Sequence, residues 1–468
     1  MCTVQGDWVQ RLAYTGLLRL ATEMLASAPS VSICVLTSSS TVYGLQLSVG
    51  SSGVMLKATI MEDIPVKPPL AADDQIWIER QALRLRDHPT VSAALAGLAD
   101  YWHGHAQVSG TQRKLFDREF ERVTFCGLMD AVNSDPRHPG IHAFGRLEHM
   151  LDGVVVPATR TMHPNLDYIY RLIPLDGMSS LALTGRVVPG RAPLSIEYAM
   201  LTAGQVYQKT LALQDLVLGP AGEFQITVDA GPADGRPNHF TSTPETHQLL
   251  LRDVLAAPGQ WPLELQIVRD AALDVRPIDA DAIAASAIAH IRRHIDGVLH
   301  INKAIALASA PNHFVDPRVH TEGIYSASQA YSTGNYRLSE DECLVIMLTL
   351  GSADYAAVPV TNLWGGVGDI PGQRSNLSTP TATRNPDGSY TFVVAHADPG
   401  HANWVQTAGE HEGVIFMRWV GLKQGATALP TVQATVLKLD DVRRDHAGKG
   451  RAEDFLSARA ARYREVMG

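Results

Sequence analysis

The chain has few cysteines, no excess of positive charge and no long apolar run. Its four cysteines are spread over 468 residues without a CxxC spacing, which excludes a disulfide framework and a zinc ribbon. The formal net charge of −9 disfavours a nucleic-acid partner, because such proteins present concentrated positive charge to phosphates. No apolar stretch approaches the length of a membrane span, so we expect no membrane insertion.

The N-terminus also lacks the pattern of a secretory signal, which needs a basic region followed by an apolar run. Residues 12–25 are apolar on one face only, because Arg19, Thr22 and Glu23 interrupt them. This pattern predicts an amphipathic helix. We therefore expect a cytoplasmic protein.

Several catalytic signatures are missing as well. The sequence has no GxSxG nucleophile elbow, no HExxH metal helix and no Walker phosphate loop. Gly365, Gly366 and Gly368 form a glycine-rich stretch, but they lack the GxGxxG spacing of a dinucleotide-binding turn. We therefore expect neither an organic cofactor nor a bound metal.

What is present indicates an α+β protein of two or three domains, with 45% hydrophobic residues. Helical spacing of apolar residues is found over residues 7–28 and in three segments between 73 and 134. It recurs over 279–308, where Asp279 is placed to cap the helix. A charged helix is expected over 452–466.

Between these helices the sequence is rich in short apolar runs separated by Pro, Gly and Asp, which is typical of antiparallel sandwiches or barrels. Near the N-terminus, Gly50-Ser-Ser-Gly53 predicts a hairpin turn between two strands. The expected domains are a mostly helical N-terminal domain, a β-rich middle module, a connecting helix, a β-rich C-terminal module and a final helix, over residues 1–135, 136–278, 279–309, 310–445 and 446–468.

The first polar constellation opens the middle module. His163 and Asp167 could supply a general base and the carboxylate that orients it. Tyr170 and Arg171 follow in the next strand and could contact a substrate, with Arg171 holding an anionic or carbonyl oxygen. The alternative is a turn before a strand, in which Asp167 only bonds to backbone N–H groups.

The second constellation lies in the C-terminal module. Trp364 could form a substrate platform, since indole offers a large apolar area and one N–H donor. Arg374 and Asn376 follow it and could bind polar substrate atoms. The alternative is that Trp364 is a core residue at the end of a strand.

The third constellation is a polar loop that follows a turn and a strand. His396 or Asp398 could act as a general acid or base, because histidine titrates near neutral pH. A metal held by His396, Asp398 and His401 is also possible, although the spacing matches no defined metal signature. Alternatively the loop is a tight turn, with Asn403 and Trp404 pinning it to the sandwich.

An arginine follows this loop inside an apolar strand. Arg418 lies within residues 413–420, which are otherwise almost entirely apolar. Burying an unpaired charge is costly, so Arg418 needs a partner or a ligand.

Seven short motifs in the C-terminal region resemble those of bacterial proteins grouped as domain of unknown function 1214. A middle segment, Pro164-Asn-Leu-Asp-Tyr-Ile-Tyr170, resembles the partner family, domain of unknown function 1254. The resemblance implies two β-rich modules packed together and implies little about chemistry. The C-terminal motifs are Glu342-Cys-Leu-Val-Ile346, Asn362-Leu-Trp364, Arg374-Ser-Asn376, Asn385-Pro-Asp-Gly388, His396-Ala-Asp-Pro399, Asn403-Trp404 and Arg418-Trp419.

The sequence therefore predicts a site in a cleft between the two β modules, since domain junctions often hold pockets. We expect an enzyme without an organic cofactor, a lyase or hydrolase, that acts on a small organic molecule by acid/base chemistry. A non-catalytic protein that binds a sugar or a lipid-like molecule is the alternative. A third possibility is an assembly protein, in which the N-terminal helices form a homo-oligomer interface.

Overall fold

The computed structural model describes three strands before residue 61, Leu70, residues 72–446 with short gaps, and Val466. The gaps are residues 109, 258, 270–278, 321–325, 327, 369–373 and 424–426. The helix expected over 7–28, and all but Val466 of the one expected over 452–466, lie outside the described residues. None of the helices within the described segments has both the length and the apolar character needed to cross a bilayer.

The chain divides into two compact units, residues 1–67 and 68–468. The first contains an antiparallel three-stranded sheet in the order β1-β2-β3. Gly50 lies opposite Gly53 at the β2–β3 turn, as the hairpin prediction required. These strands are β1 (Ser30–Leu36), β2 (Val42–Gly50) and β3 (Gly53–Ile60).

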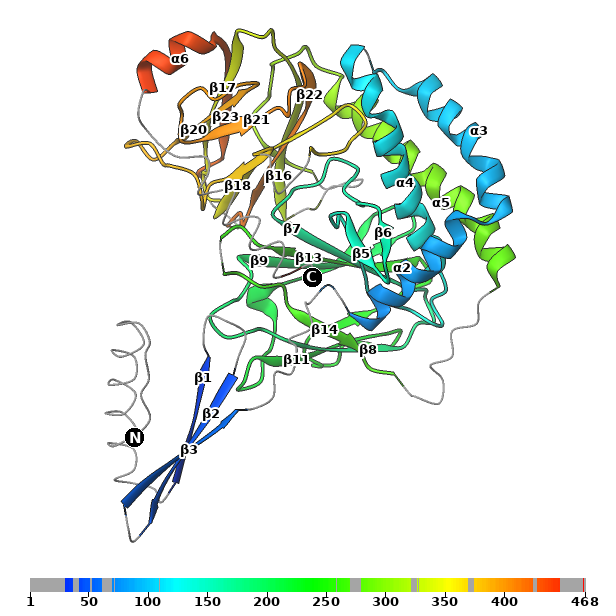
Figure 1. The fold of residues 1–468 in the computed structure, drawn as a ribbon, viewed down its shortest axis with the longest axis vertical. Helices are drawn as coiled ribbons and strands as arrows, with labels where there is room; N and C mark the ends of the chain where they lie inside the picture. Colours follow the sequence, from blue (N-terminus) through cyan, green and yellow to red (C-terminus); the bar gives the residue numbers. More distant parts are fainter. Residues whose placement is uncertain are drawn as a thin grey trace. The chain divides into compact units, whose positions relative to one another are not determined.

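The second unit begins its β structure with a sandwich built from the middle of the chain (Figure 1). A five-stranded sheet, β10-β9-β13-β7-β4, packs on a four-stranded sheet, β12-β11-β8-β14. A separate hairpin joins β5 (His149–Leu151) to β6 (Val154–Val156). The sandwich strands are β4 (His142–Phe144), β7 (Tyr168–Pro174), β8 (Leu181–Arg186), β9 (Ser195–Thr202), β10 (Tyr207–Ala212), β11 (Glu223–Asp229), β12 (His239–Thr241), β13 (Thr246–Val254) and β14 (Glu264–Ile267), with the short helix η2 (Leu213–Asp215) after β10.

A second sandwich follows, with sheets β15-β16-β22-β18-β19 and β21-β20-β17-β23. The two sandwiches have the same strand order. Strands β7 to β14 of the first correspond one by one to β16 to β23 of the second, and β4 corresponds to β15. Each sandwich also contains one short parallel pair of strands. The strands are β15 (Arg318–Val319), β16 (Gln329–Arg337), β17 (Glu342–Thr349), β18 (Tyr355–Thr361), β19 (Asn376–Ser378), β20 (Tyr390–Ala395), β21 (Trp404–Gln406), β22 (Glu412–Val420) and β23 (Thr431–Lys438), and helix α6 (Leu439–His446) follows them.

Helices form a layer of their own beside the sandwiches (Figure 1). Asp279 caps α5 by accepting a 3.0 Å hydrogen bond from the Ala282 N–H, as predicted. A Cβ on Gly127 would lie 2.5 Å from the Ile291 nitrogen, so glycine is what allows α4 to lie against α5. The helices are α2 (Asp73–Arg86), α3 (Pro89–His105), η1 (Gly110–Leu115), α4 (Phe116–Val132), α5 (Ala280–His300) and the π-helical turn η3 (Ile301–Ala306).

The helices and both sandwiches confirm the predicted α+β class. The division between compact units falls at 67–68, whereas the sequence suggested a boundary near 135. The reason is that α2 to α4 share one apolar core with α5 and with Trp364 of the second sandwich. Helices separated by more than a hundred residues of β structure therefore pack as a single layer.

Candidate functional site

Each of the two five-stranded sheets places one arginine–tyrosine pair at the boundary between the sandwiches. Arg252 lies opposite Tyr170 in the pairing of β13 with β7. Arg418 lies opposite Tyr331 in the equivalent pairing of β22 with β16. Around them, apolar residues of both sandwiches form one cluster that includes Tyr168 and Tyr355. We call the inter-sheet cluster the set Arg252, Arg418, Tyr168, Tyr170, Tyr331, Glu197, Tyr207, Ser326, Ser328 and Gln329.

Arg252 is neutralised by a carboxylate of its own sheet. Its Nη1 donates to Glu197 Oε1 and, at 2.5 Å, to the Tyr207 hydroxyl. The other Glu197 oxygen accepts hydrogen bonds from Ser326, Ser328 and, at 3.1 Å, Gln329 Nε2. Burial opposes ionisation of Glu197, but Arg252 and these donors outweigh it and lower its pKa.

Arg418 is bound differently. Its Nη1 donates to the Tyr170 hydroxyl at 2.8 Å and its Nη2 to the His163 carbonyl oxygen at 3.0 Å. Within the described part of the chain, no carboxylate pairs with this guanidinium, and its buried Nε–H has no acceptor. The Tyr168 and Phe416 rings lie 5.6 and 5.1 Å from its Cζ. Arg418 thus carries a positive charge that aromatic rings and dipoles surround but do not neutralise.

Tyr170 is the residue that connects the two arginines. Its ring centroid lies 6.0 Å from the Arg252 Cζ, and its hydroxyl oxygen accepts from Arg418 and, at 3.3 Å, from the Asn165 N–H. With both hydrogen bonds accepted, the hydroxyl proton has no acceptor among the described residues. Tyr170 therefore has one hydrogen-bond donor that is not used within the described residues.

Tyr168 and Tyr331 lie in the same electrostatic environment as the two arginines. Burial raises the pKa of Tyr331, and Arg252 and Arg418 both act against this increase. Tyr168 and Tyr331 each donate to Gln329 Oε1 at 3.3 Å. Arg418 and Tyr207 are half-buried and Ser328 is exposed, so solvent reaches the cluster from its edge.

His163 and Asp167 lie next to this cluster, although not as a base and its orienting carboxylate. His163 is fully buried and its Nδ1 lies 2.7 Å from Thr361 Oγ1. Burial lowers its pKa to about 3, so it is neutral at physiological pH. Asp167 accepts from the Tyr355 hydroxyl at 3.0 Å, and its N–H donates to Asn165 Oδ1, which is the predicted turn.

Arg171 points to the opposite face of β7, into the core of the first sandwich. Its guanidinium pairs with Asp253 and donates to Leu263 O at 2.9 Å and the Tyr198 hydroxyl at 3.2 Å. Arg171 and Asp253 are 3% and 0% exposed. The predicted substrate role of Arg171 does not fit this position, because neighbouring residues of a strand project to opposite faces.

Trp364 lies in the helical core and forms no exposed platform. Its indole N–H donates to Gln112 O at 2.8 Å, and its ring lies 5.1 Å from Trp102 and 4.9 Å from Phe116. With 1% exposure, it matches the alternative of a core tryptophan.

Three further predicted contacts hold loops of the second sandwich. Arg374 Nη2 donates to Ala402 O at 2.6 Å, and Asn403 Nδ2 donates to Thr383 O and Thr391 O at 2.7 and 2.8 Å. The indole N–H of Trp404 donates to Ala395 O at 3.1 Å. Asn376 is buried on β19 and, through its pairing with Pro359, lies on the same face of that sheet as Arg418, the face turned away from the core of the second sandwich.

His396 and Asp398 do not join His163 and Asp167 in a common cavity. The His396 ring contacts Thr407 Oγ1 at 2.9 Å and Leu338 O at 3.4 Å. Asp398 is exposed and accepts from the Gly400 N–H at 2.7 Å, as a tight turn requires. The predicted acid/base loop therefore lies at the four-stranded sheet, and no metal-ligating group of three or more residues occurs in the described segments.

Sequence reasoning missed Arg252, Glu197 and Tyr331. A signal for Arg252 was present, because residues 249–254 (LLLRDV) and 415–420 (IFMRWV) both place an arginine two positions before the end of an apolar strand. The cost of a buried charge that singled out Arg418 applies equally to Arg252. Glu197 carries no comparable signal.

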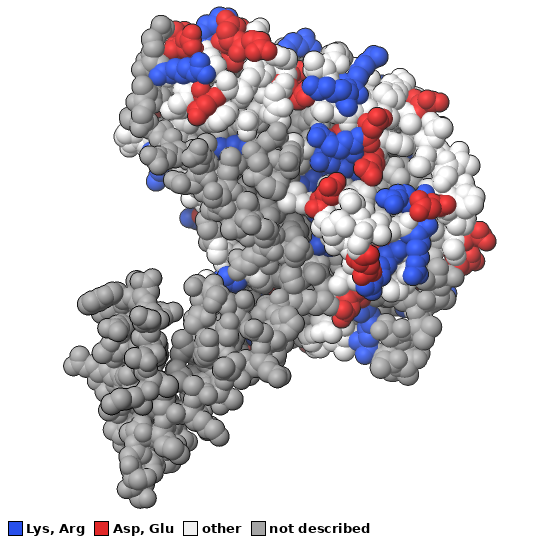
Figure 2. Space-filling view, viewed as in Figure 1, with Lys and Arg blue, Asp and Glu red and all other residues white. Residues whose placement is uncertain are grey.

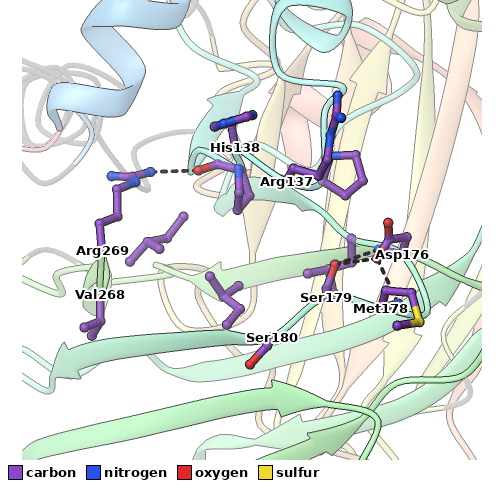
Figure 3. A pocket seen from close by; sticks show the side chains of 13 residues that line it. Arg137, His138, Asp176, Met178, Ser179, Ser180, Val268 and Arg269 are labelled. Atoms are coloured by element: carbon purple, nitrogen blue, oxygen red, sulfur yellow. Dashed lines mark hydrogen bonds between the residues drawn. The ribbon is translucent and has the colours of Figure 1, made fainter. Parts of the chain in front are cut away.

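One pocket, of about 360 Å³, lies elsewhere, at the ends of β7 and β14 (Figure 3). Its charged groups are engaged with neighbours: Arg137 with Asp135 at 2.9 Å, and Arg269 with Asp74 at 2.8 Å. Acidic and basic side chains also alternate over the helical face in Figure 2. Neither feature offers an uncompensated charge like that of Arg418.

No family model matches the chain, and no curated protein matches it. Among solved structures, the chain is similar to an uncharacterized protein from Burkholderia cenocepacia, with a TM-score of 0.64 and 22% identity over 78% of this chain and 99% of that one. The VPA0106 protein from Vibrio parahaemolyticus gives a TM-score of 0.37 and 10% identity over 74% and 100% of the two chains. The first likeness shows the fold alone, and the resemblance to domains of unknown function 1214 and 1254 stays a prediction.

Proposed function

We propose that the inter-sheet cluster binds a small organic anion, and that Tyr170 transfers a proton to or from it while Arg418 holds the negative charge. The observation that carries this proposal is the Arg418 guanidinium, which is half-buried among aromatic rings without a carboxylate partner in the described residues. Buried donors without acceptors cost about 1–3 kcal/mol. An anionic ligand beside the accessible part of the guanidinium would supply the missing negative charge.

Acid/base chemistry of a lyase or hydrolase type is the activity that these groups support best. Tyr170 has a hydroxyl proton that no described residue accepts, and its oxygen lies 2.8 Å from the Arg418 guanidinium, next to where a bound anion would be held. The buried rings of Tyr168 and Phe416 lie beside the Arg418 guanidinium, and Tyr331 packs on Phe416, which keeps the surroundings of the charge poorly solvated. We therefore assign proton transfer to Tyr170, and no longer to His396 or Asp398 as the sequence suggested.

A binding protein without catalysis is the second candidate. It is favoured by the state of the nearby titratable groups, since Glu197 is saturated with hydrogen bonds and His163 is neutral and enclosed. If this alternative holds, a bound anion will be recovered unchanged after long incubation, as followed by NMR.

Replacing Arg418 by Met should weaken the binding of an aromatic carboxylate such as benzoate by about 10- to 100-fold, the usual worth of a charge-assisted hydrogen bond. Arg418→Lys keeps the charge but not the planar fork, so its affinity should be intermediate. Titration calorimetry measures both. The control is Arg186→Met, which removes a surface arginine from the first sandwich and should bind like the wild type.

Tyr170→Phe separates catalysis from binding. It should retain the affinity for the anion within a few-fold, yet lower turnover of any substrate found by about 10²–10⁴-fold. Equal affinity of Arg418→Met and the wild type would refute the proposed site. Unchanged turnover in Tyr170→Phe would leave the binding site and refute the catalytic role.

A further inference from the structure

We propose that Glu197 is a specificity-determining residue that restricts the inter-sheet cluster to ligands with a single negative charge. The inference rests on the proposed function, because it concerns the ligand that Arg418 holds. It follows from a difference between two sandwiches that otherwise share their strand order.

The two arginines occupy equivalent places, but their neighbours on the third strand differ. In the first sandwich, Glu197 of β9 lies opposite Arg252 of β13. In the second, the residue of β18 opposite Arg418 is Ala357. A carboxylate thus stands beside one guanidinium and a methyl group beside the other.

This difference leaves the cluster with two guanidinium groups and one carboxylate, and hence one uncompensated positive charge. Glu197 is held ionised by Arg252, Tyr207 and three donors from the segment that precedes and begins β16. Because every one of these groups is in contact with it, Glu197 is a fixed negative charge facing the second sandwich.

A ligand with one carboxylate can pair with Arg418, and the rest of the ligand carries no charge for Glu197 to repel. A ligand with two carboxylates would bring the second toward the Arg252 side, since the Tyr170 ring, whose hydroxyl binds Arg418, lies 6.0 Å from the Arg252 Cζ. There it meets the Glu197 carboxylate, and like charges in a poorly solvated place repel strongly. Arg252 offers this second carboxylate no net charge, because Glu197 already pairs with it.

The test compares benzoate, isophthalate and benzamide, which share one ring and carry one, two and no negative charges at pH 8. By titration calorimetry, the wild type should bind benzoate at least tenfold more tightly than either of the others. Tighter binding of isophthalate than of benzoate would overturn the inference without any variant.

The variant Glu197→Gln keeps the size and a hydrogen-bonding oxygen but removes the charge. It should improve the binding of isophthalate relative to benzoate by at least tenfold. The matched control is Glu264→Gln, which removes a surface carboxylate of the same sandwich that pairs with Arg186, and it should keep the wild-type ratio. Should Glu197→Gln fail to fold, the wild-type comparison still tests the single-charge preference, which isophthalate binding as tightly as benzoate would overturn.

The two proposals fail in different ways. If benzoate binding depends on Arg418 but the ratio in Glu197→Gln stays within twofold of the wild type, the role of Glu197 is refuted and the anion site stands. If no anion binds in a manner that depends on Arg418, both are refuted.

Discussion

Replacing Arg171 by Met is expected to lower the free energy of unfolding by about 3–5 kcal/mol, because it leaves a buried carboxylate without its cation. Asp253 is fully buried and, among the described residues, would keep only the Tyr198 hydroxyl at 3.0 Å and the Leu263 N–H at 3.3 Å as donors. Chemical denaturation followed by circular dichroism measures the loss. Anion binding by the folded variant should be unchanged, because Arg171 lies on the other face of β7.

The control for this prediction is Arg186→Met, which breaks a pair with Glu264 whose side chains are 53% and 40% exposed. Exposed pairs contribute about 0–1 kcal/mol, so this loss should be small. The double variant Arg171→Met with Asp253→Leu should recover most of the stability, since an apolar replacement removes the unpaired charge as well. Equal losses in Arg171→Met and Arg186→Met would show that the buried pair has no special role.

Acid is expected to destabilise the protein through His163. Its pKa is about 3 in the folded protein against 6.5 as the ordinary value, with burial as the main cause and the nearby Arg418 charge adding to it. Below pH 6.5 the unfolded chain takes up a proton that the folded chain excludes, so stability falls as the pH is lowered from 6.5 toward 3. At pH 5 this residue alone should cost about 2 kcal/mol relative to pH 7.

His163→Asn removes the titrating ring, and asparagine suits the backbone there because His163 has a φ of 54°. The difference in unfolding free energy between pH 7 and pH 5 should shrink by about 2 kcal/mol in this variant. Burial also lowers the pKa of His290, to about 4, so some acid sensitivity should persist. His300→Asn, which removes an exposed ring, is the control. An unchanged pH dependence in His163→Asn would contradict the assignment.

Elements that depend on local chemistry were predictable. The cap of α5 by Asp279 and the turn of the β2–β3 hairpin follow from short-range rules about donors and turn dihedrals. The α+β class follows from the two hydrophobic periods, which differ between helices and strands. By contrast, that α2 to α4 share a core with α5 depends on contacts such as that of Gly127 with Ile291, which no local pattern encodes.

The positions of some predicted residues, though not their roles, agree with the expected junction. Arg418, Tyr170, His163 and Asp167 do lie at the boundary between the sandwiches, as expected of a domain junction. His396 and Asp398 were chosen because polar residues gathered in a loop, but such residues also make turns and hold loop backbones. Hydrogen bonds within the loop and with its immediate neighbours account for them.

The sequence by itself determined the class of the fold and the need of Arg418 for a partner or a ligand. Only the tertiary structure decided that Tyr170 faces the inter-sheet cluster and Arg171 the sandwich core. Both faces of β7 are buried. Its residues therefore do not alternate between apolar and polar in a way that would reveal which face each side chain occupies. Only the register between distant strands placed Glu197 beside Arg252 and Ala357 beside Arg418. The charge of the site depends on that pairing, because a strand's own residues do not specify what lies opposite them.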